Sequence, residues 1–253
     1  ERAGEIFKKH SIRLLHAQIL MNLVYLDMMS CSYATARNLA EEGLRLVREA
    51  GSKSYSAYML LYLSQPVFEL GEQELAEEYV RQSLAIFRST QEVSGTAFAL
   101  SDLGNMMRRC GKFEEARTAL QESIELSRQY ELWELLMSSL TNMGMTLADE
   151  GNFEAARNCW SEAMTVAMKW GLTVEKLRIL AGIVHSAVRS HYYTEAVEYA
   201  TFLLRFPHID LATVKNLLPL LEVAQRQLSP DDIREAAERG RTRTLESIVA
   251  QIA

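Results

Sequence analysis

Apolar residues recur along the chain at helical spacing, in blocks that short polar links separate. The blocks repeat with a period of 40 residues. An alanine stands at each of six positions in this register, usually with a large apolar residue three positions before it and another ten positions after it. A period of this length predicts stacked units that share a continuous core. The alanines are Ala36, Ala76, Ala116, Ala156, Ala196 and Ala236.

Each unit is predicted to contain two helices joined by a tight turn. In the third unit the two apolar blocks cover residues 94–110 and 113–129, and Gly111 lies between them. Gly71 and Gly151 hold the same place in the neighbouring units, where the end of a helix often needs a left-handed residue. The pattern therefore predicts helix A, a turn, helix B, and a second turn that leads to the next helix A.

We predict an all-α fold in which a single array covers residues 1–253. The sequence opens with ERAGEIFKKH, which is typical of the middle of a helix, so we expect an excised part of a longer protein. Residues 1–10 are expected to end a preceding repeat, and residues 242–252 to form a C-terminal capping helix. The predicted units lie near 14–53, 54–93, 94–133, 134–173, 174–213 and 214–241.

The residue types within a unit resemble the tetratricopeptide repeat (TPR). In the third unit, helix A carries Leu100, Leu103-Gly104 and Met107, and helix B carries Phe113, Ala116, Leu120 and Ser123. The resemblance implies a right-handed superhelical solenoid of about six helix-turn-helix units. The usual repeat has about 34 residues. We therefore expect the extra residues in the helix ends and in the turn from helix B to helix A.

Residues 237–250 near the end of the chain, AERGRTRTLESIVA, carry a second resemblance. A tail of this form closes many large bacterial regulators that join an effector domain, a STAND-class ATPase and a TPR array. The resemblance implies a non-catalytic, cytoplasmic sensor domain in signal transduction and transcription regulation, which binds an inducer or partner in its concave groove. The alternative is a stand-alone TPR adaptor that scaffolds protein complexes. The matching residues are Ala237, Arg239, Gly240, Leu245, Glu246, Val249 and Ala250.

In a TPR array the A helices line the concave surface, and the resemblance transfers the groove positions to this chain. The N-terminal part of the groove is rich in Met, Tyr and Phe, which could accept an apolar side chain or pack on the adjacent A helices. The central part offers amide and basic side chains. The predicted binding residues are Tyr25, Tyr58, Gln65, Phe98, Asn105, Arg108, Arg109, Asn142, Arg178 and His185.

Asn105 and Asn142 match the two asparagines that hold a peptide backbone or a terminal carboxylate in peptide-binding TPR domains. The flanking lysines of that carboxylate clamp are missing, although Arg178 could replace one of them. Binding of an extended segment or of an anionic group fits these residues. The alternative is that Arg108 and Arg109 form solvated ion pairs with Glu69, Asp102 or Asp149.

Composition narrows the function classes. The net charge of −6 argues against a nucleic-acid surface spread over the whole molecule, and the three cysteines form no CxxC motif. No apolar run reaches membrane-spanning length, and no nucleotide-binding or hydrolase motif occurs. We therefore expect no enzyme activity, no cofactor and no metal site. The expected partners are a peptide segment, a protein domain or a small-molecule inducer, without nucleic acid or membrane.

Overall fold

The computed structural model describes the backbone of residues 2–206 and 209–252, and side chains from residue 11 onward within these ranges. The prediction that residues 1–10 end a preceding repeat rests on side chains outside the described ones. Over the described residues the structure has thirteen α-helices and no β-strand. The chain forms two compact units, Glu1–Leu103 and Gly104–Ala253, and the boundary between them falls inside α5 (Val93–Arg109). We refer to them as the N-terminal and the C-terminal unit.

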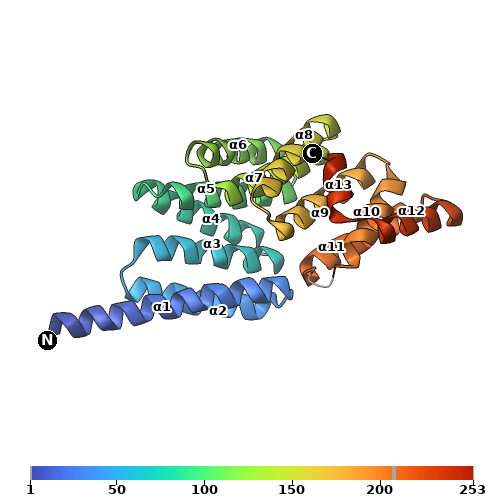
Figure 1. Cartoon of the computed structure of the whole chain (residues 1–253). Coiled ribbons are helices and arrows are strands. Elements are labelled where there is room, and N and C mark those ends of the chain that lie inside the picture. Colours follow the sequence, from blue (N-terminus) through green and yellow to red (C-terminus); the bar gives the residue numbers. More distant parts are fainter. Residues whose placement is uncertain (1, 207–208, 253) are drawn as a thin grey trace. The chain divides into compact units, whose positions relative to one another are not determined.

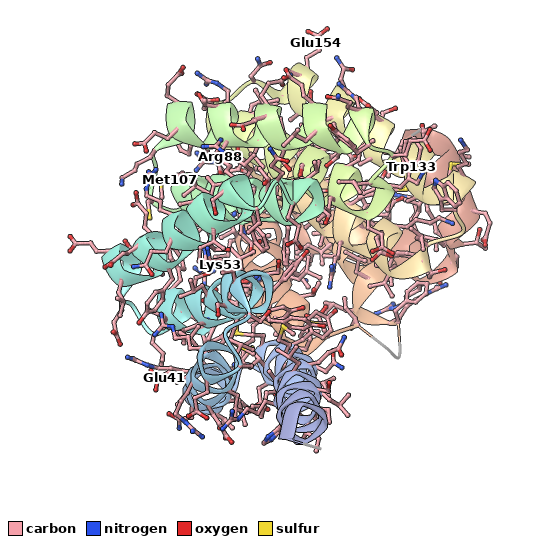
Figure 2. The ribbon with its side chains drawn as sticks, turned by 90° about the vertical axis from the view of Figure 1, so that its left-hand side faces the viewer. Glu41, Lys53, Arg88, Met107, Trp133 and Glu154 are labelled. Atoms are coloured by element: carbon pink, nitrogen blue, oxygen red, sulfur yellow. The ribbon has the colours of Figure 1, made fainter. Side chains whose placement is uncertain are left out.

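The helices of each unit follow one another as antiparallel neighbours (Figure 1). In the N-terminal unit α1 packs on α2, α2 on α3 and α3 on α4, and in the C-terminal unit the same order runs from α6 to α10. Charged side chains such as Glu41 and Glu154 extend from the helices, whereas Met107 is fully buried (Figure 2). The remaining bounds are α1 (Arg2–Met29), α2 (Tyr33–Glu49), α3 (Lys53–Glu69), α4 (Gln73–Ser89), α6 (Phe113–Gln129), α7 (Trp133–Asp149), α8 (Phe153–Lys169), α9 (Thr173–Arg189), α10 (Tyr193–Leu204), α11 (Leu211–Gln225), α12 (Pro230–Thr242) and α13 (Leu245–Ile252).

A shorter regularity of 20 residues underlies the fold. The eight helices from α2 to α9 each have 17 residues, and three-residue turns join them. The middle residue of each turn has a positive φ, which closes the preceding helix with a left-handed residue. The turns from helix B to helix A are therefore no longer than the others, and the residues beyond the usual repeat length lie in the helices. These left-handed residues are Cys31, Gly51, Gly71, Gln91, Gly111, Glu131, Gly151, Gly171 and His191.

Small residues let the two helices of a unit approach closely. Ala116 of α6 is fully buried. A Cβ atom added to Gly104 would lie 2.4 Å from Cγ of Leu120 and 3.2 Å from the carbonyl oxygen of Ala116. The contact therefore excludes any larger side chain unless Leu120 moves. The alanine and glycine positions of this unit therefore serve helix packing.

The last helices depart from the regular pairing. Helix α12 begins after Ser229, whose hydroxyl accepts from the amide of Asp232 at 3.2 Å, and Pro230 stands at the first helical position. Helix α12 packs on α10. A Cβ atom on Gly240 would lie 2.3 Å from the carbonyl oxygen of Glu198, so the two backbones meet at a glycine.

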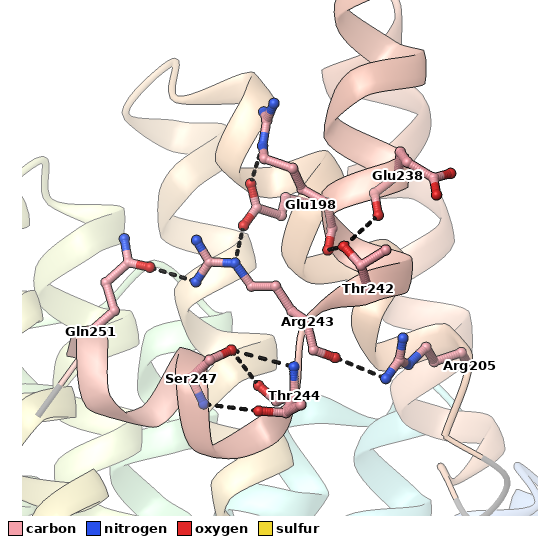
Figure 3. Close-up of polar contacts among 9 residues, drawn as sticks. Glu198, Arg205, Glu238, Thr242, Arg243, Thr244, Ser247 and Gln251 are labelled. Carbon is pink, nitrogen blue, oxygen red and sulfur yellow. Dashed lines mark hydrogen bonds and ion pairs between the residues drawn. The ribbon is translucent and has the colours of Figure 1, made fainter.

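The final helix, α13, packs on α8 and buries Ile248 and Val249. An ion network lies at the start of this helix (Figure 3). The carboxylate of Glu198 accepts from Nε of Arg239 at 2.8 Å and from Nε of Arg243 at 2.6 Å. The carbonyl oxygen of Arg243 in turn accepts from Arg205 at 2.8 Å. Buried apolar side chains and a paired carboxylate thus attach α13 to the C-terminal unit.

Candidate functional site

Polar side chains gather on the A helices of the C-terminal unit. Asn105 and Arg108 lie three residues apart near the end of α5, which places them on one helix face. Asp149 ends α7, and His185 lies near the end of α9. Because α7 and α9 pack against each other, residues in equivalent repeat positions come close in space. The repeat therefore brings three A helices to one polar surface.

The carboxylate of Asp149 is the centre of this surface. Its Oδ2 atom accepts from Nη1 of Arg108 at 2.8 Å, and its Oδ1 atom lies 2.8 Å from Nε2 of His185. Arg108 also donates from Nη2 to the side-chain oxygen of Asn105 at 3.2 Å. The carbonyl oxygen of Asp149 accepts from Arg189 at 3.4 Å. We call Asn105, Arg108, Asp149 and His185 the Asp149 cluster.

The Asp149 cluster is an ion pair held partly out of water. The side chains of Arg108 and Asp149 are 11% and 14% exposed. Burial acts to raise the pKa of Asp149, but hydrogen bonds from His185 and Arg108 outweigh it, so the pKa lies below its usual value. The Nε atom of Arg108 is buried without a hydrogen-bond partner among the described residues. The carboxylate is therefore ionised at neutral pH, and the guanidinium is only partly satisfied.

The structure brings together three of the predicted site residues, Asn105, Arg108 and His185. Asn142 lies on α7 and is partly buried, whereas Arg109 and Arg178 are exposed on α5 and α9. Of the predicted alternative ion pairs, the one between Arg108 and Asp149 is present. An arginine that binds a ligand carboxylate at this place would have to exchange its bond to Asp149.

Sequence reasoning placed Asp149 on the groove side of the fourth unit and offered it as an ion-pair partner of Arg108 or Arg109, but it missed the bond between Asp149 and His185. A signal was available in the 40-residue register. Asn105 and His185 occupy the same repeat position, and Arg109, Asp149 and Arg189 occupy the position four residues later. A carboxylate between two basic residues in one column predicts charge pairing between neighbouring A helices.

Two of the predicted binding residues of the N-terminal unit have different surroundings: Gln65 contacts α5, and Tyr58 lines a pocket. Gln65 of α3 donates from Nε2 to Oδ2 of Asp102 in α5 at 3.1 Å. Burial raises the pKa of Asp102 to about 7, and the bond from Gln65 opposes that rise. Tyr25 is 45% exposed, and Phe98 is partly buried.

Tyr58 lines a surface pocket of about 400 Å³ in the N-terminal unit. Tyr55 and Tyr62 of the same helix, Met21 of α1 and Glu92 before α5 contribute to its wall. We call it the tyrosine pocket. Met21 is only 8% exposed, which agrees with packing between helices, yet it also borders this pocket. Sequence reasoning placed Tyr58 in the groove but did not predict that three tyrosines would share one cavity.

The described residues contain no group of three or more His, Cys, Asp or Glu side chains that could hold a metal ion. Among the described helices, none combines the length and the apolar character needed to cross a membrane. Cys159 packs partly buried beside Trp160, and burial raises the pKa of its thiol to about 11. A thiol with such a pKa is a poor nucleophile at neutral pH.

Comparison with known families and structures agrees with this architecture. Residues 95–169 match the tetratricopeptide repeat family. No curated protein sequence matches the chain significantly. The family match covers α5 to α8, where the repeat columns are most regular.

Solved structures of similar fold include a Rap protein complexed with competence and sporulation factor, at 15% identity and a TM-score of 0.66. That similarity covers 95% of this chain and 77% of the other. Aspartyl phosphate phosphatase F from Bacillus subtilis has 12% identity and a TM-score of 0.61, with coverage of 85% of this chain and 61% of that chain.

A third similar structure is the Rap conjugation gene regulator of the plasmid pLS20 with a Phr peptide, at 10% identity and a TM-score of 0.54. Its coverage is 99% of this chain and 77% of the other. At these identities the likeness concerns the fold. The predicted all-α architecture of TPR units is confirmed.

Proposed function

We propose that the chain is a non-catalytic peptide-binding module, which holds an extended segment of a partner on the A helices of the C-terminal unit. The observation that carries the proposal is the Asp149 cluster, in which side chains of α5, α7 and α9 meet on one face. A partly buried ion pair contributes little net stability, because desolvation offsets the attraction between the charges. The Arg108–Asp149 pair lies on helices that otherwise pack through apolar side chains. We therefore favour a role for this ion pair in recognition rather than in stability.

The chemistry of the surface suits a peptide backbone. Asn105 and Asn142 each carry an amide that can donate to a carbonyl group and accept from an N–H group. Asp149 fixes Arg108 and His185 in place, which lowers the entropy that is lost when a ligand binds. One structure of similar fold is a complex with a Phr peptide, and another is a complex with competence and sporulation factor. The Phr complex supports a peptide as the occupant.

Catalysis has weaker support. The ring of His185 bonds to Asp149, and within the described part of the chain no serine or cysteine is hydrogen-bonded to this ring. A hydrolase of this type needs a nucleophile within reach of the base. A phosphatase is among the proteins of similar fold, but the chain spans only 61% of its length. Binding without chemistry is therefore the function that the site supports best.

At a finer level we infer a cytoplasmic sensor array of a larger bacterial regulator of the STAND class, in which the occupant could also be a partner domain or a small-molecule inducer. The tail residues Ala237, Arg239, Gly240 and Leu245 support this inference. Arg239 and Gly240 also have structural roles at Glu198, so the tail is explained in part by packing. A stand-alone adaptor is the alternative, and it would use the same surface.

The proposal can be tested with a random peptide library displayed on phage and selected on the chain. Selected peptides are then synthesised, and their affinity is measured by fluorescence polarisation. We expect the double variant Asn105→Ala, Asn142→Ala to bind them at least about tenfold more weakly, because two amide hydrogen bonds are lost. Thermal unfolding should stay close to that of the wild type.

The matched control is Gln82→Ala with Gln121→Ala, which removes two amides from exposed positions of the B helices α4 and α6. This control should leave the affinity unchanged. Equal affinity of the wild type and the asparagine variant, or failure to select any peptide, would contradict the proposal.

A further inference from the structure

The tyrosine pocket of the N-terminal unit has a wall of regular geometry. Tyr55, Tyr58 and Tyr62 follow at spacings of three and four residues along α3, so their rings lie on one face of that helix. Gln18 and Met21 of α1 also line the pocket. The rings are partly rather than fully buried. Three tyrosine side chains therefore border an open space of about 400 Å³, which is within the usual size range of ligand pockets.

Contacts behind the pocket fix the central ring. The ring of Tyr58 meets the ring of Phe87 edge to face, with 4.7 Å between their centroids. Burial is the main cause that raises the pKa of Tyr58, and the nearby carboxylate of Glu92 adds to the rise. Tyr58 thus stays protonated and neutral at physiological pH. A ring held in this way offers a preformed surface, so little side-chain entropy is lost on binding.

The charge of the pocket has one sign. Its described lining includes the carboxylate of Glu92 and contains no Lys, Arg or His. A second carboxyl group, that of Asp102, lies close enough to Tyr62 to raise the pKa of this phenol, although burial is the larger cause. Aromatic faces carry negative potential and attract cations. The rings and the carboxylate therefore favour the same kind of ligand.

Other occupants fit these features less well. An anionic group would be repelled by Glu92. A purely apolar group would cover that carboxylate without pairing it, and an unpaired buried charge is costly. A cation with an apolar stem matches both the rings and the carboxylate, and arginine and lysine side chains have this form.

We propose that the tyrosine pocket binds the guanidinium or ammonium group of a basic ligand, with Glu92 as its counter-ion and the rings of Tyr55, Tyr58 and Tyr62 as cation–π faces. The proposal rests on the proposed function only in taking this cation from a side chain of a bound peptide. A free alkylguanidine of the same chemistry is the other source.

The test uses the whole chain and defined probes. The first probe is acetyl-Ala-Ala-Arg-Ala-Ala-amide, the second is its citrulline analogue, which has the same shape without the charge, and the third is agmatine, a free guanidine. Binding is followed by NMR of the tyrosine ring signals. We expect the arginine peptide to bind about tenfold or more tightly than the citrulline peptide. Equal binding of these two peptides would overturn the proposal.

Variants assign the interaction to the pocket. Glu92→Gln should reduce the preference for arginine over citrulline to about twofold or less, and Glu74→Gln, at an exposed position of α4, should preserve it. Tyr55→Leu should weaken arginine binding in the same way, which provides a second reading if Glu92→Gln fails to fold. If both pocket variants kept the full preference for the arginine peptide over the citrulline peptide, the assignment of binding to the tyrosine pocket would be wrong.

The outcomes also separate the two sources and the two proposals. Tighter binding of the arginine peptide than of agmatine supports a peptide side chain as the source of the cation. Tighter binding of agmatine overturns that source. Loss of arginine preference in Glu92→Gln but not in the asparagine double variant supports the pocket on its own. An asparagine variant that still binds all library-selected peptides contradicts the proposed function while the pocket assignment stands.

Discussion

At the scale of single residues, two carboxyl groups on the A helices show how surroundings decide the charge. Asp149 receives hydrogen bonds from His185 and Arg108, and its pKa is lowered despite burial. Asp102 receives a hydrogen bond from the neutral amide of Gln65, and burial raises its pKa to about 7. The two pKa values differ because a positively charged partner stabilises the ionised carboxylate enough to offset its desolvation, whereas a neutral amide does not.

The raised pKa of Asp102 predicts a pH dependence of stability. In the unfolded chain this carboxyl group should ionise near 3.8, the ordinary pKa of an aspartic acid. Between that value and about 7 the folded chain binds more protons than the unfolded chain, so stability falls as the pH rises through this window. We expect Asp102→Asn to raise the melting temperature at about pH 8, by roughly 2–4 °C for about 1 kcal/mol.

Near pH 4 the variant and the wild type should melt alike, because protonated aspartic acid and asparagine are both neutral. Calorimetry over this pH range measures the difference. The control Glu74→Gln removes an exposed carboxylate and should not change the pH profile. A melting temperature of Asp102→Asn below that of the wild type at about pH 8 would show that the ionised carboxylate stabilises the fold.

At the scale of helices, the 17-residue length of α2 to α9 explains why the repeat is longer than usual. A left-handed residue ends each of the helices α1 to α9, and glycine supplies five of these nine positions. The other four are non-glycine residues at positive φ, which costs backbone energy. Sequence reasoning found the turns at Gly71, Gly111 and Gly151 but did not name Gly51 or Gly171. It could not place the left-handed residue at Cys31, Gln91 or Glu131, since those residue types carry no such signal.

The attachment of α13 gives a prediction at this scale. Glu198 is 6% exposed and pairs with Arg239 in the last turn of α12 and with Arg243 in the link between α12 and α13. Glu198→Gln keeps the shape but removes the charge that both guanidinium groups share. We expect hydrogen exchange of the amides in Leu245–Ile252 to become about tenfold faster, corresponding to a loss of about 1.4 kcal/mol.

The control for this variant is Glu238→Gln, at a position where an exposed carboxylate pairs with Arg241. Exchange in α13 should then match that of the wild type. If Glu198→Gln also left the exchange rates unchanged, the apolar contacts of Ile248 and Val249 would be sufficient to hold the helix.

At the scale of the whole molecule, the repeat columns account for packing and leave recognition to the residues that vary. The alanine column is fully buried in all six positions. Asn105, Arg108 and His185 are at equivalent or neighbouring places where the other units carry different side chains. Scaffold and site therefore use separate positions of the same repeat.

The regulator form of the proposed function belongs to this scale as well. If the chain is the sensor part of a STAND-class regulator, the gene that encodes it should also encode a nucleotide-binding domain with a phosphate-binding loop. Sequencing of the complete gene checks this expectation. A gene without such a motif would favour the adaptor alternative, and peptide binding at the Asp149 cluster would be unaffected.

The sequence by itself determined the helix pairs, their order and the packing columns. These features depend on local periodicity and on contacts that recur every 40 residues, so each unit repeats the signal of the previous one. The handedness of the superhelix, the unit boundaries and the binding roles of the predicted residues stay predictions. The structure adds that Pro66 lies within the helix α3 and is buried, so that α3 continues through it to Glu69.

Only the tertiary structure decided which polar groups meet. The bonds of Asp149 to Arg108 and His185 join residues 41 and 36 positions apart, and they depend on side-chain conformations that no repeat column fixes. The same holds for Glu198 with its two arginines and for the cavity that Tyr55, Tyr58 and Tyr62 share with Glu92. Packing follows from residue size in a repeated register, whereas pairing of charges depends on positions that differ between the units.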